Sequence, residues 1–322
     1  MKKFKKIIRA VLVLAVLAGL IYLIPKVITV VRLKRAADSY VAASSVSTFK
    51  DSKTTIIYDT NDQELCTMKN TKDMYYVSYQ EIPVTLVNSF VVMEDRQFYK
   101  HSGYDIKAIL RAIVINQKSN DIAQGASTIT QQLARNIFLS QEVTWQRKVE
   151  EIFIAVGLEK KYSKNQILEF YLNNIYFGNG YYGVEAAARG YFDKSVSELT
   201  LAEQTFIAAI PNNPTRYNPL TNYDNTVQRK NLILQQLYEA DDIGSLDRYM
   251  AETEEVVLNP HQTEEINNSV VTYARHCATE SLMSVSGFTF RYNFSSEDDY
   301  NAYEATYDTF YNMCQQKLLS GG

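Results

Sequence analysis

The chain has 322 residues, of which 46% are hydrophobic and 12% aromatic, and its 33 basic and 36 acidic residues give a net charge of −3. This composition excludes a disordered chain, a collagen-like repeat and a small disulfide-stabilised domain, and the length supports one large or two small domains. Nine of the basic residues lie within residues 1–35, which contain no acid, so the remaining 24 basic and 36 acidic residues make an acidic body, which argues against a nucleic-acid-binding protein.

Residues 10–31 form the first element, an apolar segment long enough to cross a membrane. Residues 10–24 are apolar without interruption, and the apolar character resumes after Lys26. A helix of this length spans a hydrocarbon core of about 30 Å, and the lysine can extend to the headgroups. The basic residues on both sides favour a cytoplasmic tail at residues 1–9, by a modest margin. We therefore expect a single-pass anchor with the body outside the cytoplasm. The alternative is a cleaved signal peptide, although no good cleavage site follows the apolar run.

Residues 32–78 are predicted to form a stalk with a short β-like piece. The stretch TTIIYDTNDQEL has β-branched residues followed by an Asn61-Asp62 turn, which is typical of a small hairpin. The chain offers no metal-ligand pattern, because its three histidines form no HxxH or HExxH spacing and its three cysteines are odd in number and widely spaced. We therefore predict neither a disulfide framework nor a metal site.

Residues 79–219 carry the strongest helical patterns. N-cap signals at Ser127, Ser163 and Thr200 each precede an apolar-periodic run, and the last two are capping boxes with a Gln or Glu three residues later. A further helix is indicated by apolar residues at i, i+3, i+4 and i+7, which are Val149, Ile152, Phe153 and Val156. The region is therefore predicted to be mostly α-helical.

The helix after Ser127 has an unusual polar face. Its members recur at i, i+3, i+4 and i+7 and are Thr128, Gln131, Gln132 and Arg135. An ordinary solvated face would be rich in Glu and Lys. This face instead carries neutral amides, a hydroxyl and one guanidinium, which favours the interpretation that it lines a cleft. The alternative is a buried hydrogen-bonded network that holds two helices together.

Two other clusters carry charge. Arg147 and Glu151 stand four residues apart on one predicted helix face, with Lys148 beside them. Taken alone, this pattern is more typical of a surface salt bridge than of a site. The segment MEDRQFYKHSG places Glu94 and several other charged groups among aromatic residues, and its alternative reading is a turn with ordinary surface charges.

Five segments in order resemble the five motif blocks of the peptidoglycan glycosyltransferase family, which forms the polymerase domain of class A penicillin-binding proteins and the monofunctional transglycosylases. The segments are EDRQFYKHSG, GASTITQQLARN, RKVEE, KNQILEFYLNNIYFGNGYYGVEAAARGYF and LTLAEQTFIAAIPNNPTRYNP. The resemblance covers residues 79–219 and implies a lysozyme-like, mostly helical fold with a membrane-facing apolar jaw, for which IKAILRAIVI is suited.

The resemblance implies the chemistry. The family joins disaccharide units of lipid II, and the acceptor's 4-hydroxyl attacks the anomeric carbon of a chain linked to polyprenyl pyrophosphate, with inversion. Glu94 matches the family's general base, a role that typically contributes ~10²–10⁴-fold. Glu151 matches a second glutamate that assists at the leaving group or orients the site. This pair is similar in logic to the paired carboxylates of glycosidases.

The same resemblance implies a set of substrate-binding residues. Those matched to pyrophosphate, sugars or cleft lining are Ser127, Thr128, Gln131, Gln132, Arg135, Asn136, Arg147, Lys148 and Asn173. For Asn173, a role in supporting the fold is as well favoured as a role in binding. His101 and Gly103 are expected to shape the loop of the first segment, EDRQFYKHSG. The family usually has lysine at the position of Arg135, so charge is kept while geometry changes. No cofactor is required, although a divalent cation (Mg or Mn) near Glu94 helps some members.

The segment VQRKNLILQQLYEADDIGSLDRYMAETEEVVLNP resembles the helical linker that follows the polymerase domain in bifunctional penicillin-binding proteins, so residues 220–322 are predicted to form a linker-like helical extension. The sequence Ser47-Thr48-Phe49-Lys50 matches the transpeptidase nucleophile motif only formally, because it precedes the polymerase motifs and no K-T-G follows. Two readings stay open: a truncated bifunctional enzyme, or a monofunctional polymerase with an extension.

The sequence as a whole predicts a polymerase in the bacterial cell membrane, with its catalytic domain extracytoplasmic, that makes β-1,4-linked glycan strands. Its expected partners are lipid II, the growing strand, the membrane and other cell-wall synthesis proteins, with no nucleic acid. Two rivals remain. One is a lytic hydrolase. The basic residues matched to pyrophosphate binding and the predicted membrane anchor argue against it. The other is a catalytically silent, membrane-tethered scaffold that binds lipid II or cell-wall synthesis partners.

Overall fold

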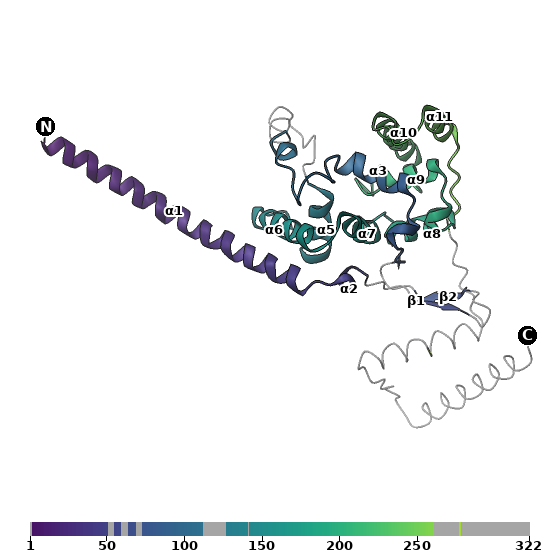
Figure 1. Ribbon diagram of the computed structural model, residues 1–322, viewed down its shortest axis with the longest axis horizontal. Coiled ribbons are helices and arrows are strands. Elements are labelled where there is room, and N and C mark those ends of the chain that lie inside the picture. The colour runs from purple at the N-terminus through teal and green to yellow at the C-terminus, as the bar shows by residue number, and fades with distance from the viewer. Residues whose placement is uncertain are drawn as a thin grey trace, which may run out of the picture. The chain divides into compact units, whose positions relative to one another are not determined.

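The computed structural model describes residues 2–50, 55–58, 64–68, 73–111, 127–140, 142–260 and 277. Side chains are described from residue 22 onward, apart from those of 55–58, 64–68 and 73. Within these residues the chain is mostly helical, as predicted (Figure 1). The chain divides into two units, Met1–Asp51 with Met74–Pro260, and Ser52–Asp73 with His261–Gly322.

The chain begins with a long helix, α1 (Lys2–Ala43), whose C-terminal part packs against α6 (Trp145–Lys161). Gly157 permits this approach, because an added Cβ would lie 2.8 Å from Val41 Cγ2. Lys161 Nζ donates to the carbonyl of Val41 at 2.7 Å and also to those of Ala42 and Ser44. A lysine from another helix thus satisfies carbonyl groups that a helix end leaves without partners.

The predicted anchor at residues 10–31 is only partly described. Among the described residues, no helix is long and apolar enough to cross a membrane. Residues 10–21 belong to α1, but their side chains lie outside the described set.

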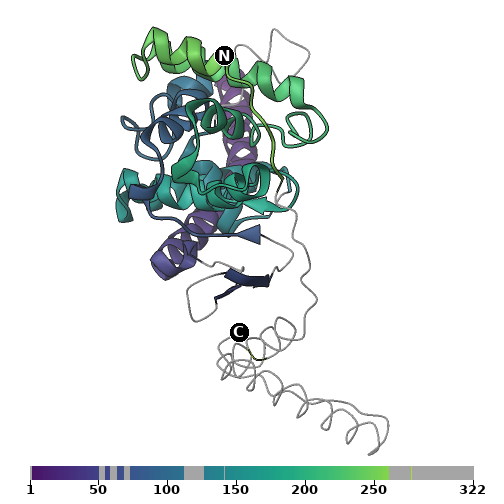
Figure 2. The same ribbon diagram turned by 90° about the vertical axis from the view of Figure 1, so that its right-hand side faces the viewer.

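Helices make up most of the first unit. After a short α2 (Val46–Phe49) come α3 (Val84–Glu94), α5 (Ile129–Phe138), α6, α7 (Lys164–Asn174), α8 (Val184–Phe192), α9 (Leu201–Ala208), α10 (Tyr223–Glu239) and α11 (Ser245–Thr253). Single 3-10 turns lie at Tyr79–Glu81 and Val196–Glu198. The arrangement of these helices can be followed in two views (Figures 1 and 2).

The predicted capping boxes are confirmed at Ser163 and Thr200, each of which accepts from the backbone N–H three residues later. The predicted N-cap at Ser127 is wrong by one residue. Thr128 caps α5 instead, accepting from Gln131 N at 3.2 Å. The physical reason is that the Ser127 hydroxyl accepts from Lys148 Nζ at 2.5 Å, which ties that residue to α6.

The strands are short. In the second unit β1 (Thr55–Tyr58) pairs antiparallel with β2 (Glu64–Met68), with an irregularity between Ile57 and Tyr58. This pairing confirms the predicted hairpin, whose turn at Asn61-Asp62 lies outside the described residues. A second two-stranded sheet joins β3 (Asp73–Met74) to β4 (Tyr181–Tyr182).

The hydrophobic core surrounds α7, which packs against α5. Five neighbouring apolar side chains of α7 are at most 1% exposed, namely Ile167, Leu168, Phe170, Tyr171 and Leu172. A helix that is apolar around most of its circumference belongs in the interior. Helix α5 also packs against α6, while α3 packs on α9 and α10. The core therefore fixes α3, α5 and α6 around α7.

Gly103 sits where the loop after α3 crosses the backbone of α6. Its φ is +105°, and an added Cβ would lie 2.8 Å from Ala155 C and from Val156 N. We expect Gly103→Ala to lower the free energy of unfolding by at least about 3 kcal/mol, because backbone strain adds to a clash with a helix that cannot move away.

Gly180 is the matched control for that substitution, since its φ is +86° but no atom lies within 4 Å of an added Cβ. Gly180→Ala should cost only about 1–2 kcal/mol, the penalty of the backbone conformation. Urea titration of the two purified variants measures both losses, and equal losses would show that the close approach at Gly103 contributes nothing.

Candidate active site

The C-terminal end of α3 brings Glu94 to the polar face of α5. Glu94 is the last residue of α3 and is half-buried. Gln132 Nε2 donates to Glu94 Oε2 at 2.9 Å. The Gln132 amide therefore binds one carboxylate oxygen of Glu94. The side chain remains partly exposed, as a group that contacts a substrate must be.

The next residue, Asp95, fixes the start of α5. Its buried Oδ2 accepts from Ile129 N at 3.0 Å and from His101 Nε2 at 2.7 Å. A carboxylate at a helix N-terminus is favoured by the helix dipole. Because Gly103 N donates to His101 Nδ1 at 3.0 Å, the ring's proton belongs on Nε2, toward Asp95. His101 and Gly103 thus shape the loop after Glu94, as predicted.

The second carboxylate, Glu151, lies on α6 and is fully buried. Arg147 Nη1 donates to Glu151 Oε2 at 3.1 Å, and Lys148 Nζ donates to Oε1. Gln131 Nε2 also approaches Oε1, at 3.3 Å. This cluster is therefore not a surface salt bridge, which was the alternative drawn from its spacing. Burial of a carboxylate costs free energy unless the group is paired and hydrogen-bonded, and these partners supply both.

Helix α5 joins the two carboxylates through neighbouring amides. Gln131 binds Glu151, and Gln132 binds Glu94. Gln131 is fully buried, which fits the network alternative at this position. Gln132 and Arg135 are half-buried, and Asn136 is exposed. The polar face of α5 thus has two parts: its buried part, at Gln131, contacts another helix, and its other part is open to solvent.

Two arginines of the site have unused donors. The Nε atoms of Arg135 and Arg147 are buried and have no hydrogen-bond partner among the described residues. Burial raises the pKa of the Tyr171 hydroxyl well above its usual value; the negative charge of Glu94 raises it further, whereas Arg135 opposes the shift. Glu94 and Arg135 therefore both act on the same buried hydroxyl. Because these Nε atoms are buried, an anionic group would have to meet the outer Nη atoms of the two guanidinium groups, which are suited to binding anions.

Asn173 has its amide engaged in the fold. Its Oδ1 accepts from Val77 N at 2.9 Å, and its Nδ2 donates to Val77 O at 2.9 Å and to Glu169 O at 2.8 Å. Both amide hydrogens are used and the side chain is fully buried. This geometry fits the structural-support alternative, in which Asn173 holds the segment that precedes α3.

A cation beside Glu94 would need several oxygen ligands. Among the residues that the structure describes, no group of three or more His, Cys, Asp or Glu could hold a metal ion. Asp95 follows Glu94 but is engaged with Ile129 and His101. The described donor set therefore does not fit a protein-chelated cation here.

The comparison with protein families matches the family described as Transglycosylase over residues 61–238, which is more than half of the chain and includes every candidate site residue. The chain belongs to the transglycosylase family. Penicillin-binding protein 4 of Bacillus subtilis (strain 168) is 43% identical over 212 residues, which are 66% of this chain and 34% of that protein. Penicillin-binding protein 1A of Escherichia coli (strain K12) is 42% identical over 222 residues, 68% of this chain and 26% of that protein.

The chain thus spans about a quarter to a third of the length of these relatives. Among solved structures, penicillin-binding protein 1A from Haemophilus influenzae aligns with a TM-score of 0.38 and 21% identity, covering 70% of this chain and 24% of that one. The resemblance drawn from the five segments is confirmed by the family match and by these relatives.

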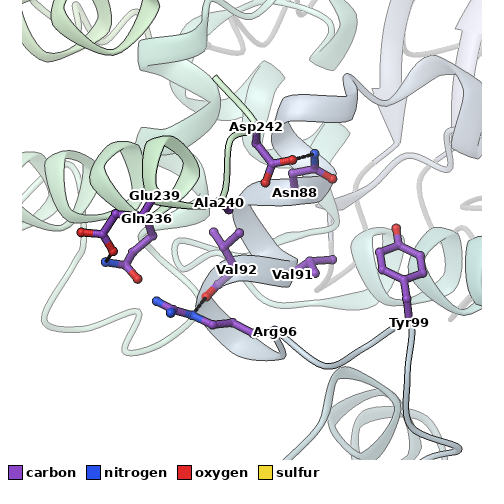
Figure 3. A pocket seen from close by; sticks show the side chains of 9 residues that line it. All are labelled: Asn88, Val91, Val92, Arg96, Tyr99, Gln236, Glu239, Ala240 and Asp242. Carbon is purple, nitrogen blue, oxygen red and sulfur yellow. Dashed lines mark hydrogen bonds between the residues drawn. The ribbon is translucent and has the colours of Figure 1, made fainter. Parts of the chain in front are cut away.

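The chain also has a hollow that was not predicted from the sequence and that is lined in part by α3. Its volume is about 320 Å³. Figure 3 shows its lining, with Asn88, Val91 and Val92 on α3 and Gln236 and Glu239 on α10. Asn88 Nδ2 donates to Asp242 Oδ1 at 2.8 Å, and burial raises the pKa of Asp242. No predicted site residue lines this hollow.

Three other participants were not singled out from the sequence. Asp95 ties Glu94's loop to α5. Tyr171 donates its hydroxyl proton to Gln132 Oε1 at 3.2 Å. Glu159 accepts from Thr130 Oγ1 at 2.6 Å and from Lys164 Nζ at 2.8 Å, which links α5, α6 and α7. The available signal was that Asp95 and Tyr171 lie within segments matched to the family, whereas Glu159 lies between two such segments.

Proposed function

We propose that this transglycosylase is a peptidoglycan glycosyltransferase, which joins the disaccharide units of lipid II into β-1,4-linked strands and releases polyprenyl pyrophosphate. The observation that carries the proposal is the arrangement of two glutamates on α3 and α6, bound by adjacent amides of α5, with cations beside the buried one. The family match and the penicillin-binding proteins among the relatives support it.

In the proposed reaction Glu94 acts on the acceptor. Its carboxylate removes the proton of the acceptor's 4-hydroxyl as that oxygen bonds to the anomeric carbon of the donor chain. The bond from the anomeric carbon to the pyrophosphate oxygen breaks on the opposite face, which inverts the configuration. Gln132 holds one oxygen of Glu94 and leaves the other for the proton.

The leaving pyrophosphate gains negative charge as its bond breaks. Arg135 and Arg147 can meet it with guanidinium charge, and Arg147 is already oriented by its bond to Glu151 Oε2 at 3.1 Å, so little reorganisation of that side chain is needed in the transition state. Glu151 is fully buried beneath Arg147 and Lys148. Of the two roles implied for it, orientation of these cations fits this burial better than direct contact with the leaving group.

The membrane is the proposed location of the reaction, with the catalytic domain outside the cytoplasm. The apolar segment at residues 10–31 supports a single-pass anchor. Apolar side chains are also exposed in the segment that follows Gly103, where Ile106 is 57% exposed and Leu110 58% exposed. Apolar side chains in such a position would contact lipid and bring the cleft to a lipid-linked substrate. Contact with other cell-wall synthesis proteins is also proposed.

The test uses the purified full chain in detergent with labelled lipid II, and glycan length is followed on a gel. We expect a ladder of polymers together with released polyprenyl pyrophosphate. Absence of polymer under all conditions, with lipid II still bound, would leave the scaffold alternative. Shortening of labelled glycan in place of polymer growth would instead indicate the lytic hydrolase.

Arg135→Ala should raise the KM for lipid II by roughly 10- to 100-fold, because charge-assisted hydrogen bonds contribute about 1.5–3 kcal/mol. Arg135→Lys, which restores the residue usual in the family, should retain most of the affinity. The control is Arg216→Ala, which removes an exposed arginine that lies 5.5 Å from the Tyr217 ring centroid. Steady-state kinetics on labelled lipid II decide the matter, and an unchanged KM in Arg135→Ala would contradict the assignment.

A further inference from the structure

Tyr171 lies behind the proposed general base without reaching the surface. Its side chain is 1% exposed, and its ring makes an edge contact with Phe90 on α3, with centroids 6.0 Å apart. Phe90 precedes Glu94 by one helical turn. The Tyr171 hydroxyl donates to Gln132 Oε1 at 3.2 Å. One residue of α7 thus contacts both the helix that carries Glu94 and the amide that binds it.

The direction of these hydrogen bonds fixes the Gln132 amide. A glutamine amide can be turned by half a rotation, which exchanges its donor and its acceptor ends. Because Tyr171 donates to Oε1, the Nε2 end points to Glu94 Oε2, at 2.9 Å. The opposite orientation would place a carbonyl oxygen against a carboxylate. Burial keeps the tyrosine protonated, since it raises the hydroxyl pKa well above its usual value, so the hydroxyl stays a donor.

We propose that Tyr171 is a positioning residue for the general base: its hydroxyl holds the Gln132 amide with Nε2 toward Glu94, which fixes one carboxylate oxygen and presents the other to the acceptor. This inference rests on the proposed function. Hydrogen bonds in a chain of this kind polarise one another, so the tyrosine strengthens the bond that the carboxylate receives. The other charged groups acting on this hydroxyl are Asp95 and Arg135, which are common to parent and variant.

Tyr171→Phe keeps the ring contact with Phe90 and removes only the hydroxyl. We expect kcat to fall about tenfold, because the carboxylate loses an oriented donor. The KM for lipid II should stay within about twofold, since a buried hydroxyl touches no substrate. A hydrogen bond to the charged form favours that form. Its weakening should therefore move the acidic limb of the pH–rate profile to higher pH, by about 0.5 to 1.

The matched control is Tyr191→Phe. Tyr191 is also fully buried, and its hydroxyl donates to Phe177 O at 2.8 Å and accepts from Asn179 Nδ2 at 3.0 Å. Both variants lose a buried hydroxyl and should lose Tm to a similar degree. Only Tyr171→Phe should lower kcat and move the acidic limb.

A second variant separates the positioning role from a general loss of order. In a Gln132→Met background the link between Tyr171 and Glu94 is already broken, so adding Tyr171→Phe should change kcat by less than about twofold. The proposal is overturned if Tyr171→Phe keeps the parent's kcat and pH profile, or if its kcat loss is undiminished in that background. An inactive parent chain would overturn the proposed function itself, which separates the two failures.

Discussion

Glu94→Gln is expected to polymerise lipid II ~10²–10⁴-fold more slowly than the parent chain, because an amide cannot accept the proton of the acceptor hydroxyl. The substitution keeps size and shape, and Gln132 Nε2 can still donate to the side-chain oxygen at position 94. Stability and lipid II affinity should therefore change little. The loss should appear in kcat, measured from the rate of glycan growth on a gel at saturating lipid II.

The control for this prediction is Glu142→Gln, which makes the same chemical change at an exposed position outside the hydrogen-bonded site. It should polymerise at the parent's rate. A Glu94→Gln enzyme as fast as the parent would refute the assignment of the base. Equal losses in both variants would point to long-range electrostatics instead of proton transfer.

The second large effect is expected for Glu151→Gln. The carboxylate is 0% exposed and accepts from Arg147 and Lys148. The substitution removes the buried charge that Arg147 faces, whereas Lys148 is 39% exposed and can be solvated, so the free energy of unfolding should fall by about 1–3 kcal/mol. The cations would also lose the contact that orients them toward the leaving pyrophosphate, and polymerisation should fall about 100-fold. Urea titration and glycan growth measure the two losses.

Glu185→Gln separates these two effects. Glu185 on α8 is 3% exposed, pairs with Arg189 Nε at 2.7 Å and accepts from Val196 N at 2.8 Å. Its substitution should lower stability as well, but leave the glycan-transfer rate of the folded protein near that of the parent. Were both variants to lose activity in proportion to stability alone, Glu151 would have no special part in the site.

Local sequence signals predicted the parts of the fold that depend on neighbours in the chain. The capping boxes at Ser163 and Thr200 are such cases, because their partners lie three residues away. At Ser127 the same logic misplaced the helix start by one residue. The hydroxyl there is bound by Lys148, 21 residues later, and this competition cannot be read from local spacing.

In the site, too, contacts between residues close in sequence were predicted and contacts between distant residues were not. The spacing of Arg147 and Glu151 predicted that they share a helix face, but not that Glu151 would be fully buried. Tyr171 contacts Gln132 across 39 residues, and Asp95 contacts Ile129 across 34. Hydrophobic periodicity predicts the helices that carry these residues, but it does not predict how the helices pack against one another. The resemblance to a family identified the two glutamates, whereas the contacts of Tyr171 and Asp95 that position Glu94 and α5 are visible only in the structure.

The most direct test of the whole account is a crystal structure of the Glu94→Gln chain with lipid II bound. We predict that the diphosphate lies within hydrogen-bond distance of the Arg135 and Arg147 guanidinium groups, and that an acceptor 4-hydroxyl lies beside the side chain at position 94. A diphosphate bound elsewhere, for example in the hollow beside Asn88 and Asp242, would contradict the proposed mechanism.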